Sequence, residues 1–242
     1  MEKGKLLYEG KAKKIYDIPG DTNAIWVEYK DDLTAFNAQK KGSFAGKGRI
    51  NARITSLIYR FLNSRGIKTH LMSEPSDHEM VCQKLEIIPL EVVTRNRLAG
   101  STAKKFGIEE GSPLPKPLVE FYFKNDALGD PFISDDQALM LKAAKDQNEL
   151  NHLKTAALKI NSELISFFKE VGLELIDFKL EFGRSNSGEI MLGDEISPDT
   201  CRLWDVKTQT KMDKDVFRRD LGDVQNTYEN VLGRLKDKWS HI

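Results

Sequence analysis

The stretch LELIDFKLEFGRSNSGEIMLGDEISPDTCRLWD, residues 173–205, carries the clearest structural signal in this chain. Its first half alternates with a period of two, the spacing of side chains on the two faces of a β-strand. Apolar side chains fall on one face and charged ones on the other: Ile176, Phe178, Leu180 and Phe182 against Asp177, Lys179 and Glu181. A turn rich in Ser, Asn and Gly follows at 185–188, and a second apolar strand then ends in Gly193-Asp194-Glu195. The pattern predicts an antiparallel hairpin with one apolar and one charged face.

Acidic side chains are concentrated in the same stretch, which contains four Asp, four Glu, one Lys and two Arg. Carboxylates gathered in this way suit Mg²⁺, which takes few protein oxygens and shares its coordination with substrate phosphates. The alternative is a solvated hairpin face with ordinary surface charge. Strict alternation from Ile190 and Leu192 places Asp194 on the apolar face, away from Glu181. A bulge at Gly193, or a strand that ends there, would remove this conflict.

The composition is that of a globular chain of 242 residues, which fits one large domain or two closely packed ones. Apolar residues make up 40% and charged residues 31%, enough for a substantial core. Lys+Arg and Asp+Glu both total 37, so no net charge favours nucleic acid or a membrane surface. An anionic ligand must therefore be held by local basic groups.

The sequence contains no pattern of a membrane span, a secretory signal or a zinc site. No apolar run approaches the ~18–20 residues of a membrane span, and MEKGKLLYEG lacks the apolar core of a secretory signal. Cys82 and Cys201 lie far apart without metal-ligand spacing, and the four histidines form no spaced cluster, so no zinc site is predicted. We therefore expect a protein of the reducing cytoplasm with two buried thiols.

The first half of the chain is rich in predicted strands, at residues 5–9, 14–18, 24–29, 80–85 and 90–94, with Pro89 separating the last two. One helix is predicted from the apolar stripe between Ile50 and Leu62, and Gly66 ends it. Prolines at 113, 115 and 117 predict a loop over 111–117, because proline has no backbone N–H to donate.

The second half mixes helices and strands. Residues 118–123 alternate as a strand, and Ser134 with Gln137 forms a capping-box signature for a helix through Ala144. The clearest helix runs over 147–171 with a 3-4 spacing of apolar residues, and Gly172 ends it. After the hairpin, residues 197–205 are predicted as a loop, and two helices close the chain.

Two segments are candidate phosphate sites. Gly10, Lys11, Ala12 and Lys13 form a small-residue turn where backbone N–H groups and two lysines can approach a phosphate. An exposed basic hairpin is the alternative there. In the second, a strand delivers Arg95 and Arg97 to a helix that begins near Gly100-Ser101-Thr102, and a helix amino terminus favours anions. Here the alternative is that Ser101 or Thr102 merely caps the helix.

Two further segments carry charged groups at predicted turns. The segment Lys124-Asn-Asp-Ala-Leu-Gly-Asp130 ends a strand, and an ordinary Asx turn accounts for it equally well. In Ser197–Asp205, Asp199 and Arg202 are candidate ligands, although the arginine could simply pair with a neighbouring carboxylate.

Taken together, the motifs YEGKAKKIY, RNRLAGS, KNDALGDP, DFKLEFG and GDEISPDTCRLWD closely resemble those of the bacterial phosphoribosylaminoimidazole-succinocarboxamide synthase (SAICAR synthetase) family of purine biosynthesis. The resemblance spans essentially the whole chain. It implies an α+β fold of two lobes with antiparallel sheets, related to protein kinase and ATP-grasp architectures. Residues 1–89 would form a β-rich ATP-binding lobe with one long helix, and residues 90–242 a larger α+β lobe carrying the metal and substrate sites.

The resemblance also implies an ATP-dependent ligase. This enzyme would join L-aspartate to the carboxylate of carboxyaminoimidazole ribonucleotide (CAIR) and give SAICAR, ADP and phosphate, with Mg²⁺ as cofactor. Members of the family are commonly homodimers or larger, without nucleic-acid or membrane partners. The rival functions are another kinase-like phosphotransferase and a non-catalytic nucleotide-binding module. Against the first, no HRD-like loop precedes the hairpin, and against the second, both predicted metal ligands are present.

On the nucleotide side, the resemblance assigns Gly10, Lys11, Ala12 and Lys13 to the phosphate loop and Lys84–Ile88 to the hinge that meets adenine. Glu181 and Asp194 resemble the Mg²⁺ ligands. Lys179 is placed near the phosphates and Asp177 beside it. These assignments come from the motifs, and the residues alone do not establish them.

On the substrate side, the resemblance assigns the ribonucleotide phosphate to Arg95, Ser101 and Arg202. Lys124, Asp130 and Asp199 are inferred to face the substrates, with Lys124 also assigned to the nucleotide and Asp199 to catalysis. One departure stands out, because many relatives carry Gly-Asp where this chain has Phe36-Asn37. An amide at position 37 cannot play an ionic role.

The chemistry inferred from the residues agrees with that reaction. A carboxylate is a poor electrophile, and ATP can activate it as an acyl phosphate that the amine of aspartate attacks. Lysines and Mg²⁺ would neutralise the phosphate charge. No general base is obvious, and Asp177 and Asp199 are both candidates for taking the amine proton.

Overall fold

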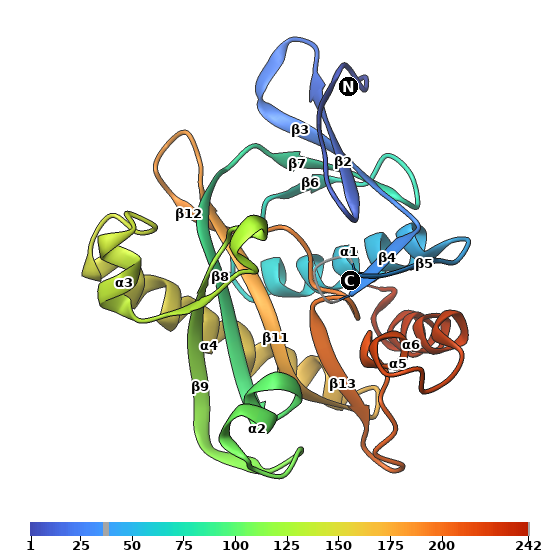
Figure 1. The fold of residues 1–242 in the computed structure, drawn as a ribbon. Coiled ribbons are helices and arrows are strands. Elements are labelled where there is room, and N and C mark those ends of the chain that lie inside the picture. The colour runs from blue at the N-terminus through green and yellow to red at the C-terminus, as the bar shows by residue number, and fades with distance from the viewer. Residues whose placement is uncertain (36–38, 242) are drawn as a thin grey trace.

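The computed structural model describes residues 1–35 and 39–241, so Phe36 and Asn37 lie outside the described residues. The first part of the chain forms a five-stranded antiparallel sheet in the order β1-β2-β3-β7-β6, at the top of Figure 1. Its strands are β1 (Leu6–Glu9), β2 (Lys13–Ile18), β3 (Asp21–Tyr29), β6 (Leu71–Ser73) and β7 (Glu79–Gln83). The three strands predicted before residue 30 are therefore confirmed, and Gly20, with a φ of +83°, lies in the turn between β2 and β3.

The second sheet has six strands and lies below the first in Figure 1. Its order is β10-β9-β8-β11-β12, with β13 also pairing with β11. The strands are β8 (Glu86–Arg97), β9 (Pro113–Phe123), β10 (Phe132–Ile133), β11 (Leu173–Arg184), β12 (Ile190–Gly193) and β13 (Cys201–Asp205). A separate hairpin pairs β4 (Asp32–Ala35) with β5 (Lys40–Ser43).

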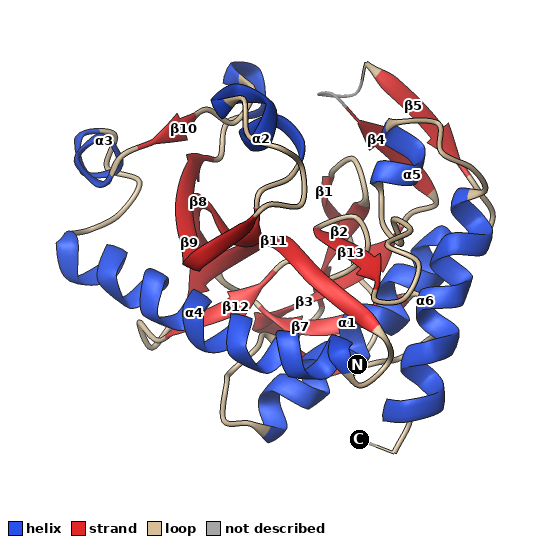
Figure 2. Ribbon diagram, turned by 90° about the horizontal axis from the view of Figure 1, so that it is seen from below, coloured by secondary structure: helices blue, strands red, loops and turns tan. Residues whose placement is uncertain are grey.

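Three long helices build the main core against one face of the second sheet: α1 (Lys47–Ser64), α4 (Gln147–Lys169) and α6 (Val224–Trp239). Figure 2 shows α4 running along that sheet. The shorter helices are α2 (Gly100–Phe106), the 3-10 turn η1 (Asp126–Leu128), α3 (Asp135–Met140) and α5 (Asp215–Arg218). The predicted capping box of Ser134 and Gln137 is present, although α3 ends at Met140 rather than Ala144.

Prolines are the main reason that the predicted strand boundaries were wrong. The segment 111–117 is not a loop, because β9 begins at Pro113. Residues two apart in a strand present their backbone nitrogens to the same edge. The neighbour on that edge, β10, pairs only with Phe121 and Tyr122, so no partner needs the missing N–H groups. Pro89 does not interrupt β8 either, since it lies where the β8–β11 register shifts.

The alternation of β11 is also interrupted once. Phe178, Leu180 and Phe182 belong to the main core as predicted, but Ile176 packs with Ala99 and Trp204 on the other face. The β11–β13 register shifts between Leu175 and Asp177, so Ile176 is the extra residue of a bulge. The predicted loop over 197–205 is likewise wrong in part, because its second half is β13.

Among the residues that the structure describes, the middle of β11 has no strand partner on one of its edges. One edge of β11 pairs with β13 up to Phe178 and with β12 from Glu181 onward. The chain between these partners, residues 194–200, passes over the centre of β11, where Lys179 N donates to Thr200 O at 2.9 Å. This loop therefore brings its own carboxylates to the charged side of β11.

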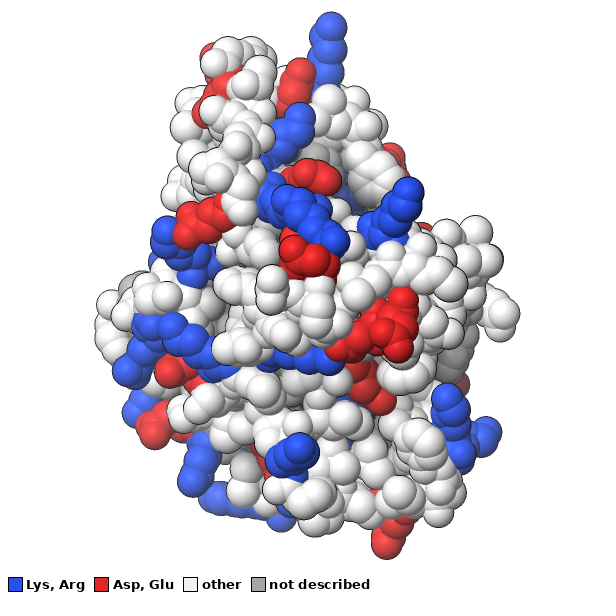
Figure 3. Space-filling model, turned by 90° about the vertical axis from the view of Figure 1, so that its left-hand side faces the viewer, with Lys and Arg blue, Asp and Glu red and all other residues white. Residues whose placement is uncertain are grey.

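Helix α1 contacts both sheets, since its Ala52 packs with Val27, Tyr29, Met80 and Cys82 of the first sheet. Helix α1 precedes β6 in the chain, yet its apolar residues share one core with α4, α6 and β11. No helix among the described residues is long and apolar enough to cross a membrane. On the face drawn in Figure 3, acidic and basic side chains are interspersed, in keeping with their equal totals.

Candidate active site

A cavity of about 600 Å³ lies between the first sheet and the charged face of the second. The β1–β2 turn, apolar residues of β2 and β3, and the loop 194–200 contribute to its walls. The predicted site residues that line it are Gly10, Lys11, Ala12, Lys13, Lys84, Lys124, Asp130, Lys179, Glu181, Asp194 and Asp199. The structure thus brings together residues that are up to 189 positions apart in the sequence, from position 10 to position 199. The other four, Arg95, Ser101, Asp177 and Arg202, lie around a second cluster described below.

Lys179 is the central cation of the cavity. Its Nζ lies 2.5 Å from Glu181 Oε1, 3.0 Å from Glu91 Oε1 and 3.7 Å from Asp194 Oδ2. A second lysine, Lys124, also reaches Glu181 Oε1, at 2.9 Å. Burial alone would lower the pKa of Lys179, but Glu181, Asp194 and Glu91 outweigh burial and raise it well above its ordinary value. Lys179 therefore stays charged at neutral pH.

Asp194 lies outside the regular β-ladder, so the alternation of β12 does not turn it away from Glu181. Strand β12 ends at Gly193, and Asp194 has a φ of +56°, a conformation that Asp tolerates better than most residues. Its Oδ1 lies 2.5 Å from Lys13 Nζ. Burial opposes the charge, but Lys13 and Lys179 outweigh it and hold the pKa of Asp194 well below its usual range. Glu181 and Asp194 thus contact the same ammonium from two different segments.

The two lysines of the amino-terminal turn have different environments. The Lys13 side chain is 11% exposed and also contacts Glu195 Oε1 at 3.1 Å. Lys11 is 44% exposed and pairs with the exposed Asp126 at 2.8 Å. The exposed basic hairpin therefore describes Lys11 but not Lys13.

The carboxylates of the cavity fit Mg²⁺ that is shared with a phosphate. Among the described residues, no cluster of three or more His, Cys, Asp or Glu side chains is arranged to hold a metal alone. Glu181 and Asp194 instead place two carboxylates around one ammonium group, that of Lys179. Mg²⁺ commonly uses one or two carboxylates together with substrate phosphates and water.

The second cluster is built around Asp177, which lies between two arginines. Arg95 Nη1 is 2.6 Å and Arg202 Nη1 is 2.9 Å from Asp177 Oδ2. Arg95 also donates through Nε to Glu120 at 2.6 Å and through Nη2 to Tyr122 at 3.1 Å. Every nitrogen of the Arg95 guanidinium thus has a protein partner, which suits Arg95 to holding Asp177 and Arg202 in place.

Arg202 lies against the amino terminus of α2. A Cβ atom at Gly100 would be 2.5 Å from Arg202 Nη2, so a larger residue cannot allow this approach. Ser101 is exposed on the first turn of α2. The alternative that Ser101 or Thr102 only caps the helix is wrong, because Ala99 is the N-cap and the side chain that accepts from Gly100 N is that of Glu110, at 3.2 Å. Arg202 and the start of α2 therefore form one basic corner.

Asp199 is held by three segments of the chain. Its Oδ2 lies 2.6 Å from Lys47 Nζ and accepts from Asn51 Nδ2 at 3.0 Å, both on α1. Its Oδ1 accepts from Tyr228 of α6 at 2.7 Å and lies 4.0 Å from Lys214 Nζ. Burial opposes the charge, but Lys214 and Lys47 outweigh it and hold the pKa of Asp199 well below its usual range.

The remaining predicted residues lie at the rim of the cavity. Lys84 belongs to the short connection between β7 and β8, and its backbone N donates to Asn23 O at 2.7 Å. Asp130 accepts from Asn125 N at 2.8 Å, and Asn125 accepts from Ala127 N, so this segment is an Asx turn as well as part of the lining.

The sequence interpretation missed Glu91, Lys47, Lys214 and His70. Glu91 shares a face of β8 with Arg95, so alternation along that strand could have found it. Lys47 is 1% exposed, but nothing in the sequence distinguishes it from a surface lysine at a helix start. Lys214 and His70 enter the cavity through tertiary packing alone.

His70 predicts a pH effect on stability. Burial and then Lys13 lower the pKa of His70 from 6.5 to about 4, so the folded protein keeps this imidazole neutral. The unfolded chain binds the proton first as the pH falls, so stability is present above pH 6.5 and is lost below it. Between pH 6.5 and pH 5, the free energy of unfolding should fall by about 2 kcal/mol more in the unchanged protein than in His70→Gln.

Chemical denaturation of both proteins across this range checks the His70 effect. The comparison must be between proteins, because burial and Asp215 raise the pKa of Asp213 to about 7, which acts with the opposite sign. Asp213 is present in both proteins, so its contribution to the free energy of unfolding cancels in the difference between them. Parallel stability curves would show that His70 is not buried as a neutral group.

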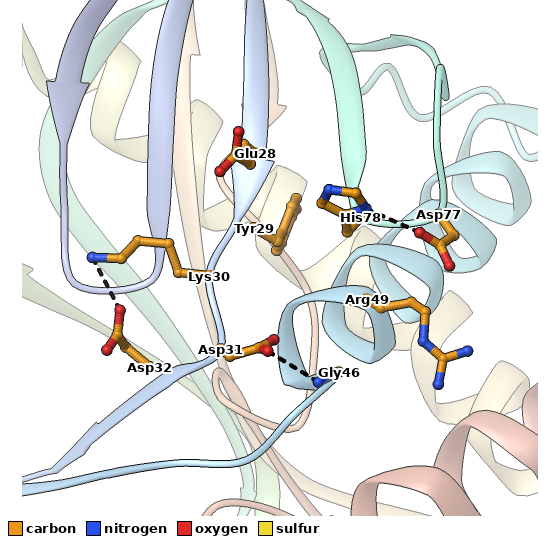
Figure 4. Close-up of a pocket in the computed structure, with 9 residues that line it drawn as sticks. All are labelled: Glu28, Tyr29, Lys30, Asp31, Asp32, Gly46, Arg49, Asp77 and His78. Atoms are coloured by element: carbon orange, nitrogen blue, oxygen red, sulfur yellow. Dashed lines mark hydrogen bonds and ion pairs between the residues drawn. The ribbon is translucent and has the colours of Figure 1, made fainter.

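A second depression, of about 460 Å³, lies beside the amino terminus of α1 (Figure 4). Asp31 accepts from Gly46 N at 3.0 Å and Gly48 N at 2.8 Å, and Lys30 pairs with Asp32 at 3.0 Å. These groups satisfy one another and the start of the helix. The depression therefore gives no indication of a ligand.

Comparison with known proteins agrees with the motifs. A profile of the SAICAR synthetase family matches residues 6–235. The phosphoribosylaminoimidazole-succinocarboxamide synthase of Anoxybacillus flavithermus is 53% identical over 235 residues, which cover 97% of each chain. A crystal structure of this enzyme from Ehrlichia chaffeensis has a TM-score of 0.93 at 42% identity and covers 96% of this chain and 98% of that one. A SAICAR synthetase in complex with ADP has a TM-score of 0.91 at 44% identity, with the same coverage. The chain therefore belongs to the SAICAR synthetase family of ATP-dependent ligases.

Proposed function

We propose that this protein joins L-aspartate to the carboxylate of CAIR and releases SAICAR, ADP and phosphate. The observation that carries the proposal is the cavity between the two sheets, where Lys13, Lys124 and Lys179 meet Glu181 and Asp194. A relative that is 44% identical is described in complex with ADP. We place ATP in this cavity, with the connection at Lys84 beside adenine and the turn 10–13 at the phosphates.

The cavity lysines would carry the first step of this reaction. CAIR presents a carboxylate, and attack of its oxygen on the γ-phosphorus of ATP gives an acyl phosphate and ADP. Lys13, Lys124 and Lys179 would hold the phosphate oxygens in line and neutralise their charge. Their carboxylate partners keep the three ammonium groups in fixed positions before any substrate arrives.

Glu181 and Asp194 would hold Mg²⁺, which supplies charge neutralisation to the phosphates when bound. Both carboxylates already contact one ammonium group, and Asp194 is kept ionised by its neighbours. On the substrate side, Arg202, Ser101 and the start of α2 would bind the ribonucleotide phosphate, and Arg95 would hold Arg202 through Asp177. Asp130 and Asp199 would face the substrates.

Release of ADP tests the proposed function. The purified protein should release ADP only when ATP, CAIR and L-aspartate are all present, and each is omitted in turn. Steady ADP release without aspartate would instead support a kinase-like phosphotransferase. ATP binding without any release would support a nucleotide-binding module.

The metal ligands give a separate prediction. Glu181→Gln and Asp194→Asn should each raise the Mg²⁺ concentration required for half-maximal activity by at least about tenfold, because each removes one charged oxygen ligand. Titration of Mg²⁺ at constant ATP measures this requirement. Glu91→Gln is the matched control, since Glu91 also contacts Lys179 but is not assigned to the metal. An unchanged Mg²⁺ requirement in both site variants would remove these ligands from the proposal.

The wider setting follows from the same family. We expect a cytoplasmic homodimer without nucleic-acid or membrane partners. We also assign residues 1–89 to a nucleotide-binding lobe and residues 90–242 to a lobe that carries the metal and substrate sites. A dimer is tested by light scattering of the purified protein.

A further inference from the structure

The amine of L-aspartate must lose a proton before it can attack an acyl phosphate, and neither predicted carboxylate is suited to accept it. Asp177 lies between Arg95 and Arg202, whose guanidinium nitrogens are 2.6 Å and 2.9 Å from its Oδ2, in a buried ion-pair cluster. Asp199 accepts three close hydrogen bonds, from Lys47, Asn51 and Tyr228. A proton on either carboxylate would break part of these contacts.

Lys214 lines the same cavity and is differently placed. Its backbone N donates to Pro198 O at 3.0 Å, which ties the start of α5 to the loop that carries Asp199. Within residues 1–35 and 39–241, the only carboxylate within 4.0 Å of its Nζ is that of Asp199, at 4.0 Å, which is beyond hydrogen-bond distance. The Lys214 side chain is nevertheless only 14% exposed. A lysine of this kind faces the cavity without a close anionic partner.

The pKa of Lys214 is lowered, mainly by burial. Burial makes the largest contribution to lowering its pKa, Asp199 and Glu195 oppose the shift, and Arg218 and Lys47 add to it. The result is a pKa below the ordinary value of lysine, in contrast to Lys179, whose carboxylate partners raise it. A lysine whose pKa is lowered by burial gives up its proton more readily, which suits it to act as a general base.

We propose that Lys214 is the general base that takes the proton from the ammonium group of L-aspartate. The N–H bond breaks and its electron pair becomes the lone pair of the amine, which forms the C–N bond to the acyl carbon. The C–O bond to phosphate then breaks, and the departing phosphate takes the second amine proton and leaves as hydrogen phosphate. Lys214 returns its proton to solvent. This role rests on the proposed function.

Two substitutions separate proton transfer from simple charge. Lys214→Arg keeps the positive charge but cannot become neutral, and Lys214→Gln removes the charge. Both should lower aspartate-dependent turnover at neutral pH by at least about 100-fold, the usual contribution of a general base. Lys211→Gln is the control, because Lys211 is three residues away, is also 14% exposed and pairs with Glu110 outside the cavity.

Hydroxylamine provides the second measurement, since it is largely uncharged at neutral pH and needs no base to attack an acyl phosphate. With ATP and CAIR, both Lys214 variants should still form the hydroxamate at a rate close to that of the unchanged protein. Their aspartate-dependent rate should also recover as the pH rises, in proportion to the free amine.

Three outcomes would overturn the role of Lys214. Retained aspartate turnover in Lys214→Arg would show that only its charge matters. Equal loss of the amide and the hydroxamate would place Lys214 in phosphoryl transfer or in folding. An aspartate rate in Lys214→Gln that does not recover with pH would exclude proton transfer. If the unchanged protein fails to release ADP with all three substrates, the proposed function fails instead.

Discussion

Lys13→Met should lower kcat/KM for ATP by about 100- to 1000-fold, the usual effect of removing one preorganised charge from a site of phosphoryl transfer. Lys13 begins β2, is largely buried, and contacts both Asp194 and Glu195. Burial works against its charge, but Asp194 and Glu195 raise its pKa well above the ordinary value. Lys13 is thus a permanent cation at the position proposed for the phosphates.

The matched control is Lys11→Met, in the same turn. Lys11 is exposed, and its pair with Asp126 is of the surface type that contributes at most about 1 kcal/mol. We therefore expect kcat/KM for ATP to change by less than about fivefold in this variant. Similar losses in both variants would mean that the turn, rather than the buried lysine, binds the nucleotide.

The loss must be separated from a loss of folding. Removing one partner of a buried ion pair typically costs about 3–5 kcal/mol, because the other charge stays buried alone. Lys13→Met removes the ion-pair partner of the buried Glu195, whereas Asp194 keeps Lys179 at 3.7 Å, so the thermal unfolding temperature of this variant should fall. Circular dichroism at the assay temperature gives the folded fraction, and the kinetic constants are then expressed per folded molecule.

The hairpin shows how far a periodic pattern predicts a site. Alternation along β11 correctly placed Lys179 and Glu181 opposite the core, because the sheet buries only one of its faces in the helical core. The same rule was wrong for Ile176, where a bulge adds one residue. Alternation holds only while every residue is paired, and the sequence does not mark where pairing shifts.

The prolines show a different limit. Their missing N–H groups correctly exclude a fully paired central strand, but whether a partner is present depends on a neighbour far along the chain. β9 accommodates Pro113, Pro115 and Pro117 because β10 is only two residues long. The physical rule was sound, but the sheet order that decides its consequence is a tertiary property.

The environment of Asp199 could not be predicted for the same reason. Its partners Lys47, Asn51 and Tyr228 lie on two helices whose predicted role was to pack the core. Each helix was predicted from its apolar stripe, which says nothing about polar residues at the margin of that stripe. The motifs therefore predicted most of the charged residues that line the cavity. Which of these residues form ion pairs and hydrogen bonds with one another depends on how the helices pack in the folded protein.

Arg202→Ala should weaken binding of CAIR about 10-fold or more, because a charge-assisted hydrogen bond contributes about 1.5–3 kcal/mol. The fold should tolerate this change. Arg202 pairs with Asp177 and, through its Nε, with Asp215 at 2.9 Å. In the variant, Asp177 would keep Arg95 at 2.6 Å and Asp215 would keep Arg218 at 2.6 Å, so neither buried carboxylate is left without a cation. The loss should therefore appear in ligand binding rather than in unfolding.

Calorimetric titration with each ligand separates the two phosphate sites. Arg202 lies at the start of α2, whereas the lysines assigned to ATP line the cavity between the sheets, so affinity for ATP should change far less than affinity for CAIR. Arg97→Ala removes an equal charge from the same end of β8, where Arg97 bonds to Glu174 at 2.7 Å, and should leave both affinities close to those of the unchanged protein. An equal loss of affinity for ATP and for CAIR in Arg202→Ala would contradict this assignment. It would show that Arg202 and the start of α2 affect both ligands and do not bind the ribonucleotide phosphate specifically. The assignment of Ser101 to that phosphate would then fail as well.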